Sequence, residues 1–493
     1  MSATETTVEL GPFIAGRAER LGDSTQEIRD PASQRLVGRV PASCGEDVDR
    51  AVRAADEAFA GWSARGVAER GEIVAHAAQA IRAAVDELAL LLTSEQGKPL
   101  REARIELNKA AETLEHYAGL AKELRGIFVL GLDPGVSGQV LRRPLGVVAA
   151  IVPWNFPTTL LANKLGPALV AGNTVVAKPA DTTPLTTLRV AAIMHEAGLP
   201  AGVFNVVPGR GAETGEALVT HALVRKVAFT GSTPTGQRIM SLAAGGTKRL
   251  TLELGGSDPM IILEDADLAK AASAASMGRF FNCGQACLAV KRLYVAESVA
   301  DEVVKAVVQK ASRLTVGRGT EKGVQLGPLH SERQRDLLED QLRRTLDQGG
   351  EVLTGGGRPE GDDLSDGWFH EPTIVLEPPH DSPMASEEVF GPALPVWRIS
   401  DLDEAIERAN ASPFGLGSSV WTSDLDAAAE AAERLECGYT WINSPTKVYD
   451  ELPFGGVKAS GFGKEHGSEA FDYYTDQKAV VVRRRDRGRP SSP

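Results

Sequence analysis

The segment of this sequence whose residue types are best suited to catalysis contains two cysteines four residues apart. Cys283 and Cys287 follow a predicted helix over residues 268–281 and precede a strand that begins at Val290. A cysteine between two elements and beside a flexible glycine can present its sulfur to a cleft, where a thiol acts as a nucleophile. A free cysteine that packs as a small apolar residue is also compatible with this pattern. Zinc binding is disfavoured, because one Cys-x3-Cys pair lacks a second pair of ligands.

Five further short motifs accompany this segment. In chain order the set is PWNFP (153–157), FTGST (229–233), LELGG (252–256), GQAC (284–287), EVFGP (388–392) and PFGG (453–456). Each motif alone is weak evidence, whereas six in this order are not explained by chance. Together they resemble the aldehyde dehydrogenase superfamily, from about residue 10 to residue 482. The resemblance implies an α/β fold with a Rossmann-type nucleotide-binding domain, an α/β catalytic domain and a small β oligomerisation flap.

The resemblance implies catalytic roles for three residues. Cys287 is the nucleophile that converts a planar aldehyde into a tetrahedral thiohemiacetal, from which hydride leaves readily. We expect backbone N–H groups and partial exposure to favour its thiolate. Asn155 and the backbone N–H of Cys287 donate to the charged oxygen of that intermediate. Glu253, whose apolar context raises the pKa of a carboxyl group, is the base that activates water for thioester hydrolysis.

Each role has a structural alternative. Asn155 is also a suitable cap for the helix that follows it, and Glu253 is alternatively a carboxylate on the solvent face of a strand. Glu465 matches a glutamate with a proton-relay role in some relatives, or it lies on the surface. Cys283 matches no catalytic residue, so we expect a packed neighbour of Cys287; an oxidative disulfide between them is less favoured.

Three other activities compete with aldehyde oxidation to the acid. Transfer of the acyl group to coenzyme A is disfavoured, because the branches that do so differ at the position of Glu253. A noncatalytic binding protein of the same fold is disfavoured, because such chains usually lack the thiol or the base. Ester cleavage by the same thiol is compatible as a side activity.

Two segments are candidates for the phosphates of a dinucleotide. Gly209, Gly211 and Gly215 have G-x-G-x3-G spacing, which departs from the usual dinucleotide fingerprint. The resemblance instead places the pyrophosphate near Ser232, at the start of a helix whose N-terminal amides favour anions. A plain turn with a serine cap is the alternative. Trp154, in the first motif, is a further candidate cofactor contact.

The resemblance also implies contacts to the two riboses. Lys178, at the end of a predicted strand, matches the lysine that contacts the adenosine ribose. Asp181 occupies the position of a carboxylate that binds ribose hydroxyls and repels a 2′-phosphate, so NAD is favoured over NADP, although Lys178 could attract that phosphate. Glu388 matches the residue that holds the nicotinamide ribose, with Phe390 beside it. A loop glutamate and a core phenylalanine are the alternatives.

The residues expected around the thiol do not identify the aldehyde. Asn163 and Phe281 stand where relatives that oxidise succinate semialdehyde carry arginines, which argues against a dicarboxylic semialdehyde. The other candidates are mostly neutral: Leu160, Ala286, Leu288, Lys447 and Tyr449. Lys447 could meet an anionic tail.

The periodicity of the chain predicts where these residues lie. Apolar positions spaced by three and four predict two or three helices over residues 45–92. Strands at 147–152, 174–177, 203–207 and 226–230 alternate with helical segments such as 184–196, which predicts βαβ units and a parallel sheet. A second α/β unit starts near Asp258, with strands at 260–263 and 290–296 and helices at 268–281 and 299–314. Residues 349–367 are expected to form a surface loop, and residues 136–141 and 478–482 to form edge strands that pair between subunits.

With the resemblance, these elements give domain boundaries. We expect the nucleotide-binding domain at 1–125 and 145–256, the catalytic domain at 257–460, oligomerisation strands at 126–144 and 470–486, and a tail at 487–493. A chain of 493 residues exceeds the size of one core, in line with several domains.

Bulk properties exclude several classes of protein. With 53 basic and 66 acidic residues the net charge is −13, which disfavours nucleic acid as a partner. The basic run from Arg483 lies in a Pro- and Ser-rich terminus expected to be solvated. Four cysteines are too few for a disulfide framework, and we recognise neither a signal peptide nor an apolar stretch of 18 residues. We expect a cytoplasmic homodimer or homotetramer that acts on a small aldehyde, without metal or membrane.

Overall fold

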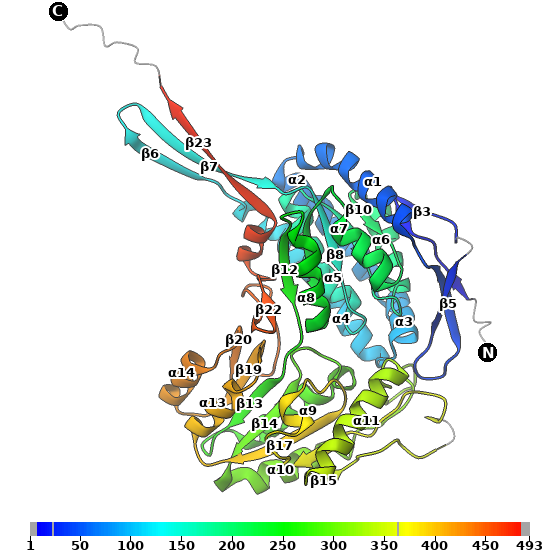
Figure 1. Cartoon of the computed structure of the whole chain (residues 1–493), viewed down its shortest axis with the longest axis vertical. Coiled ribbons are helices and arrows are strands. Elements are labelled where there is room, and N and C mark those ends of the chain that lie inside the picture. Colours follow the sequence, from blue (N-terminus) through cyan, green and yellow to red (C-terminus); the bar gives the residue numbers. More distant parts are fainter. Residues whose placement is uncertain (1–6, 22–23, 362–363, 485–493) are drawn as a thin grey trace, which may run out of the picture.

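The computed structural model describes residues 7–21, 24–361 and 364–484. The largest sheet of the described residues has eight strands and lies in the half of the molecule that contains both β8 and β12 (Figure 1). The strand order is β22-β12-β11-β8-β9-β10-β2-β3. Its five parallel strands are β8 (Val147–Ile151), β9 (Thr174–Lys178), β10 (Phe204–Val206), β11 (Val224–Thr230) and β12 (Arg249–Glu253). The antiparallel additions are β22 (Gly461–Phe462), β2 (Phe13–Ile14) and β3 (Arg17–Ala18). The strand order reverses at β8 and β11, and such a switch point is where open α/β sheets bind ligands.

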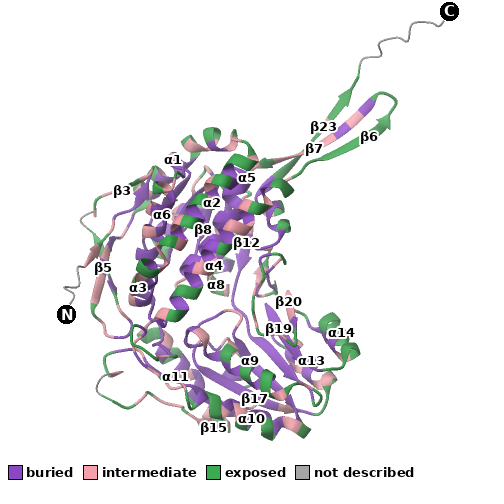
Figure 2. Cartoon of the chain, turned by 180° about the vertical axis from the view of Figure 1, so that it is seen from behind, coloured by how far each residue is buried: buried purple, intermediate pink, exposed green. Residues whose placement is uncertain are grey.

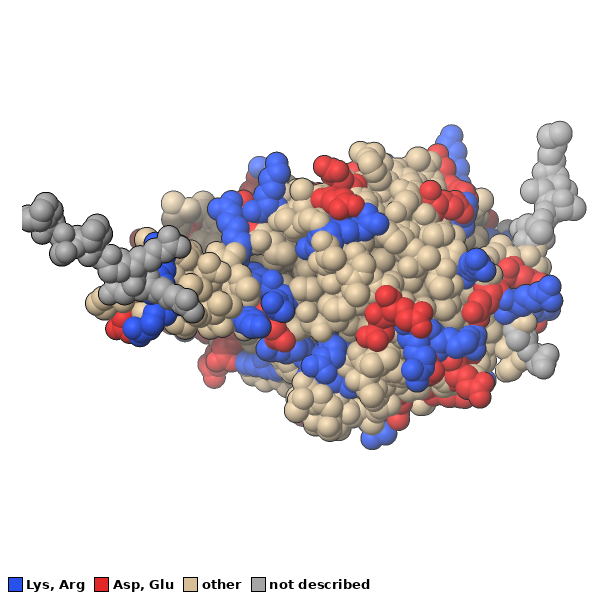
Figure 3. Space-filling view, turned by 90° about the horizontal axis from the view of Figure 1, so that it is seen from above, with Lys and Arg blue, Asp and Glu red and all other residues tan. Residues whose placement is uncertain are grey.

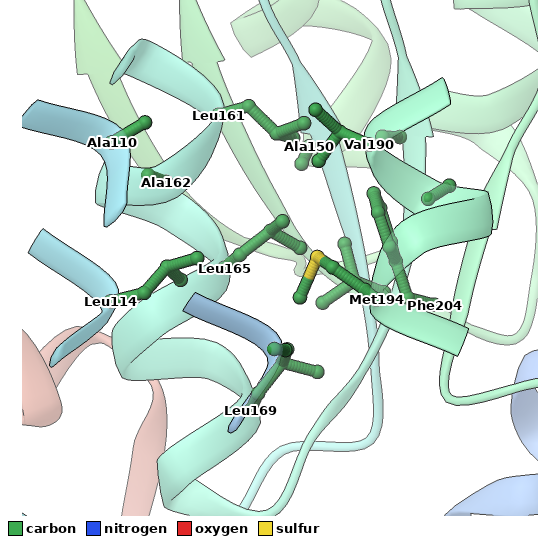
Figure 4. Packing of buried hydrophobic residues seen from close by; sticks show 14 of the residues in the cluster. Ala110, Leu114, Ala150, Leu161, Ala162, Leu165, Leu169, Val190, Met194 and Phe204 are labelled. Carbon is green, nitrogen blue, oxygen red and sulfur yellow. The ribbon is translucent and has the colours of Figure 1, made fainter. Parts of the chain in front are cut away.

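Helices bury both faces of this sheet. All five residues of β8 are buried, as expected for a β-branched and alanine-rich strand covered on two sides. The helices on the strands are α1 (Gly45–Ser63), α5 (Pro157–Ala171), α6 (Leu185–Glu196), α7 (Glu216–Thr220) and α8 (Thr233–Ala244). Outside α5 and α6 pack α2 (Val67–Ala83), α3 (Val85–Gln96) and α4 (Leu100–Gly119). In Figure 4, Leu165 of α5 points towards Met194 of α6, Leu161 points towards Ala150 of β8, and Leu114 of α4 lies beside Leu165. The predicted helices over 45–92 are found as α1 to α3.

A second sheet of seven strands lies in the other half of the molecule (Figure 1). Its order is β15 (Glu351–Thr354), β16 (Thr373–Leu376), β17 (Ala393–Ile399), β14 (Val290–Ala296), β13 (Asp258–Ile262), β19 (Gly417–Trp421) and β20 (Tyr439–Ile442). Its helices are α9 (Leu268–Phe280), α10 (Glu297–Ala311), α11 (Glu332–Asp347), α12 (Pro383–Ser386), α13 (Leu402–Asn410) and α14 (Leu425–Arg434). All strands except β15 run parallel. The predicted α/β class is therefore confirmed.

The prediction of a loop over 349–367 is wrong at its start. Residues 351–354 form β15, which pairs antiparallel with β16. Val352 and Leu353 pack against the core of the second sheet, and this burial outweighs the turn-forming glycines on either side. Residues 362–363 lie outside the described part of the chain.

A three-stranded sheet projects from the main body (Figure 1). It consists of β6 (Ile127–Asp133), β7 (Val136–Pro144) and β23 (Thr475–Arg483). Both predicted strands exist, but the prediction that each is an edge strand is wrong for β7, which pairs with β6 on one side and β23 on the other. Figure 2 shows how exposed this sheet is, and every residue of β6 is exposed. Residues 485–493, including the predicted tail, lie outside the described residues.

Smaller elements complete the described chain. A short sheet contains β1 (Val8–Glu9), β5 (Leu36–Pro41) and β4 (Thr25–Arg29), and β18 (Phe414–Gly415) pairs with β21 (Val457–Lys458). Short helical turns occur at Leu120–Glu123, Gly211–Gly215, Phe281–Gly284 and Ser468–Tyr473. None of the helices formed by the described residues is long and apolar enough to cross a membrane. The face seen in Figure 3 carries both signs of charge.

Candidate active site

Cys287 lies in the connection between α9 and β14, after a tight turn. In that turn Asn282, Cys283 and Gly284 all have left-handed backbone conformations, with φ values of 51°, 56° and 71°. Asn and Gly tolerate this region, whereas Cys rarely adopts it. Cys283 is buried in the core of the second sheet, in agreement with the predicted packing role, while Cys287 is half-buried. The turn therefore places one thiol in the core and the other at its edge.

The environment of Cys287 is less favourable to a thiolate than the sequence suggested. Burial raises the pKa of its thiol to about 12, and the neighbouring Asp258, Glu253 and Glu388 add to this effect. Lys291 lowers the pKa, but not enough to offset burial. The surroundings of Cys287 thus oppose the thiolate that we expected from the sequence. The side chain is a protonated thiol that needs a proton acceptor before it can attack.

Asn155 reaches this thiol loop from the first sheet. It is buried in the connection after β8, and its Nδ2 donates to the main-chain oxygen of Gln285 over 3.0 Å. The residue before the first turn of α5 is Phe156, so the capping alternative for Asn155 is wrong. A side-chain amide from one sheet therefore contacts the loop that carries Cys287 in the other.

Glu253 is the last residue of β12, at the carboxyl edge of the first sheet. It is buried, so the solvent-facing alternative is wrong. Within the described part of the chain, neither of its carboxylate oxygens has a hydrogen-bond partner. Burial, and then the charge of Glu465, raise the pKa of Glu253 well above its usual value, while Lys164 and Lys464 oppose this. An unpartnered buried carboxyl group with a raised pKa is typical of a functional site.

Glu465 and Lys164 form a buried ion pair behind Glu253. Lys164 Nζ lies 2.6 Å from Glu465 Oε1 and donates to Thr230 Oγ1 over 2.6 Å. The surface alternative for Glu465 is therefore wrong. Glu253, Glu465 and Lys164 are thus three ionisable groups buried in one region of the interior.

The residues predicted to contact the adenosine ribose lie together after β9. Lys178 ends this strand, and burial lowers the pKa of its ammonium group to about 8, against the charge of Asp181. Asp181 is half-buried three residues later. A Cβ placed on Gly215 would lie 3.6 Å from Lys178 Cδ, so the turn Gly211–Gly215 passes beside the lysine. This arrangement fits a ribose: a cation and a carboxylate lie beside a turn that begins and ends with glycine.

Ser232 lies at the carboxyl end of β11 and directly precedes α8. It is exposed, and its hydroxyl is 2.9 Å from Thr235 Oγ1 rather than bound to a backbone amide of the helix. The first amides of α8 are therefore not capped by this side chain. A helix of 12 residues with such an N-terminus, next to the switch point, fits a pyrophosphate.

Glu388 lies beside the thiol loop. Its Oε1 accepts from the backbone N–H of Gly256 over 3.0 Å and from Lys291 Nζ over 2.5 Å. The same ammonium group donates to the main-chain oxygen of Cys287 over 2.8 Å and lies 5.5 Å from the centre of the Phe390 ring. The sequence analysis did not predict Lys291 as a site residue. The one indication in the sequence is that a lysine lies within a strand expected to be buried.

Aromatic rings border the candidate cofactor and substrate regions. Trp154 stacks on His330, with ring centres 4.5 Å apart, and meets Phe390 edge-on at 5.6 Å. Phe156 and Phe281 stack in parallel, with ring centres 6.1 Å apart. His330 was not predicted; burial lowers the pKa of its imidazole to about 4, so it is neutral at pH 7.

The residues considered for substrate choice do not form one cluster. Asn163 is buried within α5. Lys447 is exposed, and its ammonium group lies 5.1 Å from the ring centre of Tyr449. Leu288 packs with Cys287 against the buried Trp441. The structure thus brings the thiol, amide and carboxyl candidates together and leaves the lysine at the surface.

Comparison with known proteins identifies the family. The family model described as "Aldehyde dehydrogenase family" matches residues 19–480. The chain is 41% identical to a phenylacetaldehyde dehydrogenase of Pseudomonas fluorescens over 93% of each protein. It is 38% identical to a betaine aldehyde dehydrogenase of Bacillus subtilis (strain 168), covering 95% of this chain and 96% of the relative. The crystal structure of PnpE, from Pseudomonas sp. WBC-3, in complex with nicotinamide adenine dinucleotide superposes with a TM-score of 0.94 at 40% identity, covering 97% of this chain and 98% of PnpE. This chain belongs to the aldehyde dehydrogenase family.

Proposed function

We propose that the chain oxidises an aldehyde to a carboxylic acid through a thioester on Cys287. The sulfur bonds to the carbonyl carbon and the thiol proton passes to a base, which leaves a tetrahedral adduct with a charged oxygen. The second N–H of the Asn155 amide and the backbone N–H of Cys287 stabilise that oxygen. A nicotinamide cofactor bound here would supply the acceptor for the hydride that leaves the adduct carbon, and loss of that hydride leaves the thioester on Cys287.

Glu253 acts as the base in the second half of the reaction, the hydrolysis of the thioester. Its raised pKa makes its carboxylate a stronger base than an ordinary glutamate, and its oxygens are free of competing hydrogen bonds within the described chain. It takes a proton from the water that attacks the thioester; the carbon–sulfur bond breaks, and the acid leaves while the thiol is restored. The pair of Lys164 and Glu465 lies behind it and carries the proton onward. The observation that carries this proposal is the meeting of a half-buried thiol, an unpartnered carboxyl group and an amide from the opposite sheet.

The proposed cofactor is NAD, with NADP as the alternative. Lys178 and Asp181 would bind the adenosine ribose, Gly211 and Gly215 would border it, and Ser232 would lie at the pyrophosphate. The carboxylate of Asp181 disfavours a 2′-phosphate. Glu388 and Phe390 would hold the nicotinamide ribose, with Trp154 beside Phe390.

We propose that each of the three main sheets belongs to a part of the chain with its own function. Residues 1–125 and 145–256 bind the cofactor, residues 257–460 carry the thiol, and residues 126–144 and 470–486 assemble a homodimer or homotetramer. Exposed apolar side chains on β6 support the last point, since Leu130 is 75% exposed. Four free cysteines support a reducing compartment, and we propose the cytoplasm.

A panel of aldehydes assayed for NADH and NADPH, with and without coenzyme A, tests the proposal. The panel includes phenylacetaldehyde, betaine aldehyde and glutarate semialdehyde, the substrates named for relatives. Oxidation independent of coenzyme A and abolished by Cys287→Ala supports hydrolysis. A strict requirement for coenzyme A indicates the acylating alternative. Ester cleavage without cofactor, if lost in the same variant, is a side activity of the same thiol.

A further inference from the structure

A buried ion pair contacts the peptide that carries Asn155. Lys98 and Glu106 have fully buried side chains, with 2.5 Å between Lys98 Nζ and Glu106 Oε2. The same ammonium group donates to the main-chain oxygen of Asn155 over 2.6 Å and lies 4.2 Å from the ring centre of Phe156. Burying two charges costs about as much as their attraction returns, so stability alone does not explain the pair.

Asn282 contacts the same oxygen from the thiol loop. Its Nδ2 donates to the main-chain oxygen of Asn155 over 2.9 Å and to that of Gln285 over 3.3 Å. Its backbone N–H donates to Glu102 Oε2 over 2.8 Å. Its left-handed conformation, with φ of 51°, points the side chain back across the interface between the two halves of the site. Two donors, one from each half, therefore converge on one carbonyl oxygen.

These contacts determine how the Asn155 amide is oriented. One of its two N–H groups donates to the main-chain oxygen of Gln285, which leaves the other for the substrate oxygen. If the amide were reversed, its Oδ1 would face that carbonyl oxygen and repel it. The orientation therefore depends on a fixed separation between the peptide of Asn155 and the carbonyl of Gln285, and Asn282 is bonded to both.

Helix α4 anchors both sides of this arrangement. Glu102 and Glu106 lie one helical turn apart on the same face. Glu102 accepts from the thiol loop, whereas Glu106 Oε1 accepts from the backbone N–H and the hydroxyl of Thr158, over 2.9 and 2.8 Å, at the start of α5. A carboxylate is well placed at a helix N-terminus. One rigid element thus fixes the distance between the two halves of the site.

We propose that Lys98 and Asn282 are positioning residues: by donating together to the main-chain oxygen of Asn155, they hold its side-chain amide in register with the oxyanion that forms at Cys287. The inference rests on the proposed roles of Asn155 and Cys287. Neither positioning residue touches the reacting atoms, so we expect their loss to act through Asn155, with the reactivity of Cys287 measured separately.

A double-mutant cycle on the pre-steady-state burst of reduced cofactor tests this dependence. Lys98→Met and Asn282→Gly each slow the burst about 10- to 100-fold, since small displacements of a catalytic group cost about this much. In an Asn155→Ala background, the same changes slow it less than about threefold, because the group that they position is gone. Alkylation of Cys287 by iodoacetamide keeps its wild-type rate, since this reaction needs no oxyanion donor.

Arg70→Met is the matched control. Arg70 is another buried cation that donates to a main-chain oxygen of α5, that of Val170 at the far end of the helix, over 2.9 Å. We expect the Arg70→Met substitution to lower the unfolding temperature without slowing the burst. Asn282→Gly preserves the left-handed turn, so it tests the inference even if Lys98→Met does not fold.

The outcomes separate this inference from the proposed function. The positioning role is overturned if Lys98→Met and Asn282→Gly leave the burst unchanged, or if they slow it equally in the wild-type and Asn155→Ala backgrounds. It is also overturned if Arg70→Met slows the burst as much as they do. Each of these results leaves the role of Asn155 intact. If Asn155→Ala alone leaves the burst unchanged, the proposed role of Asn155 fails, and the positioning role fails with it.

Discussion

Replacing Glu253 by glutamine should separate the two halves of the reaction. The side chains have the same shape, and within the described residues Glu253 has no hydrogen bond to lose, so the fold should be retained. Space is tight, because a Cβ on Gly455 would lie 2.6 Å from Glu253 Oε1, and glutamine adds no volume. The amide cannot accept a proton, so activation of the hydrolytic water is lost. General-base catalysis contributes about 10²- to 10⁴-fold, which corresponds to about 3–5 kcal/mol of barrier.

The assay is stopped-flow detection of NADH followed by steady-state turnover. We expect a burst of about one NADH per active site and then a rate about 10²- to 10⁴-fold below that of the wild type. Circular dichroism and the unfolding temperature of the variant serve as controls. A normal steady-state rate would refute the assignment of Glu253 as the base in hydrolysis. A complete absence of the burst would show instead that attack by Cys287 requires this carboxylate.

The remaining predictions concern the thiol, pH and two buried charges. Cys287→Ala abolishes both burst and turnover, and normal aldehyde oxidation by this variant would contradict the thioester mechanism. Because burial raises the pKa of Glu253, its reactive carboxylate form increases as pH rises well above the usual titration range of glutamate; the steady-state rate of the wild type therefore rises with pH there, and that of Glu253→Gln does not. Lys291→Met removes the cation bonded to Glu388 and to the Cys287 loop, so the KM for the cofactor increases about tenfold, roughly the value of one charged hydrogen bond; an unchanged KM would exclude this role. Burial raises the pKa of Asp450, but hydrogen bonds from His466 and Lys109 outweigh burial and hold this pKa below its usual range. Asp450→Asn therefore lowers the unfolding free energy by about 2 kcal/mol at pH 7, and by less as the pH falls below about 4. Denaturant titrations of the wild type and the variant at pH 7 and below about pH 4 measure this difference.

Strands with strong local signals were predictable from the sequence. The buried run at 147–151 is rich in β-branched residues, and both it and the strand at 290–296 lie close to their predicted bounds. In contrast, the strand predicted from periodicity in this region covered only residues 136–141, and β6 fell only within the oligomerisation range 126–144 that the resemblance implied. Its apolar run lacks the alternation that marks a half-buried strand, and in the structure all its residues are exposed.

The sequence was sufficient to predict which residues form the candidate site, but not the burial and contacts of those residues. Motif order was sufficient to name Cys287, Asn155 and Glu253. The raised pKa of Cys287 depends on burial by segments distant in sequence, so the sequence favoured the wrong protonation state. Lys98 lies 57 positions before Asn155, and Asn282 lies 127 positions after it. No local pattern indicates that these side chains meet at one oxygen.

The last stretch of the chain closes two sheets that begin much earlier. Strand β22 covers the edge of β12, and β23 pairs with β7 along its whole length. During synthesis these edges therefore stay unprotected until residues 461–462 and 475–483 have emerged from the ribosome. Until then, unpaired backbone N–H and C=O groups at the open edges of β7 and β12 are accessible to other chains, so the partly synthesised protein is vulnerable to aggregation.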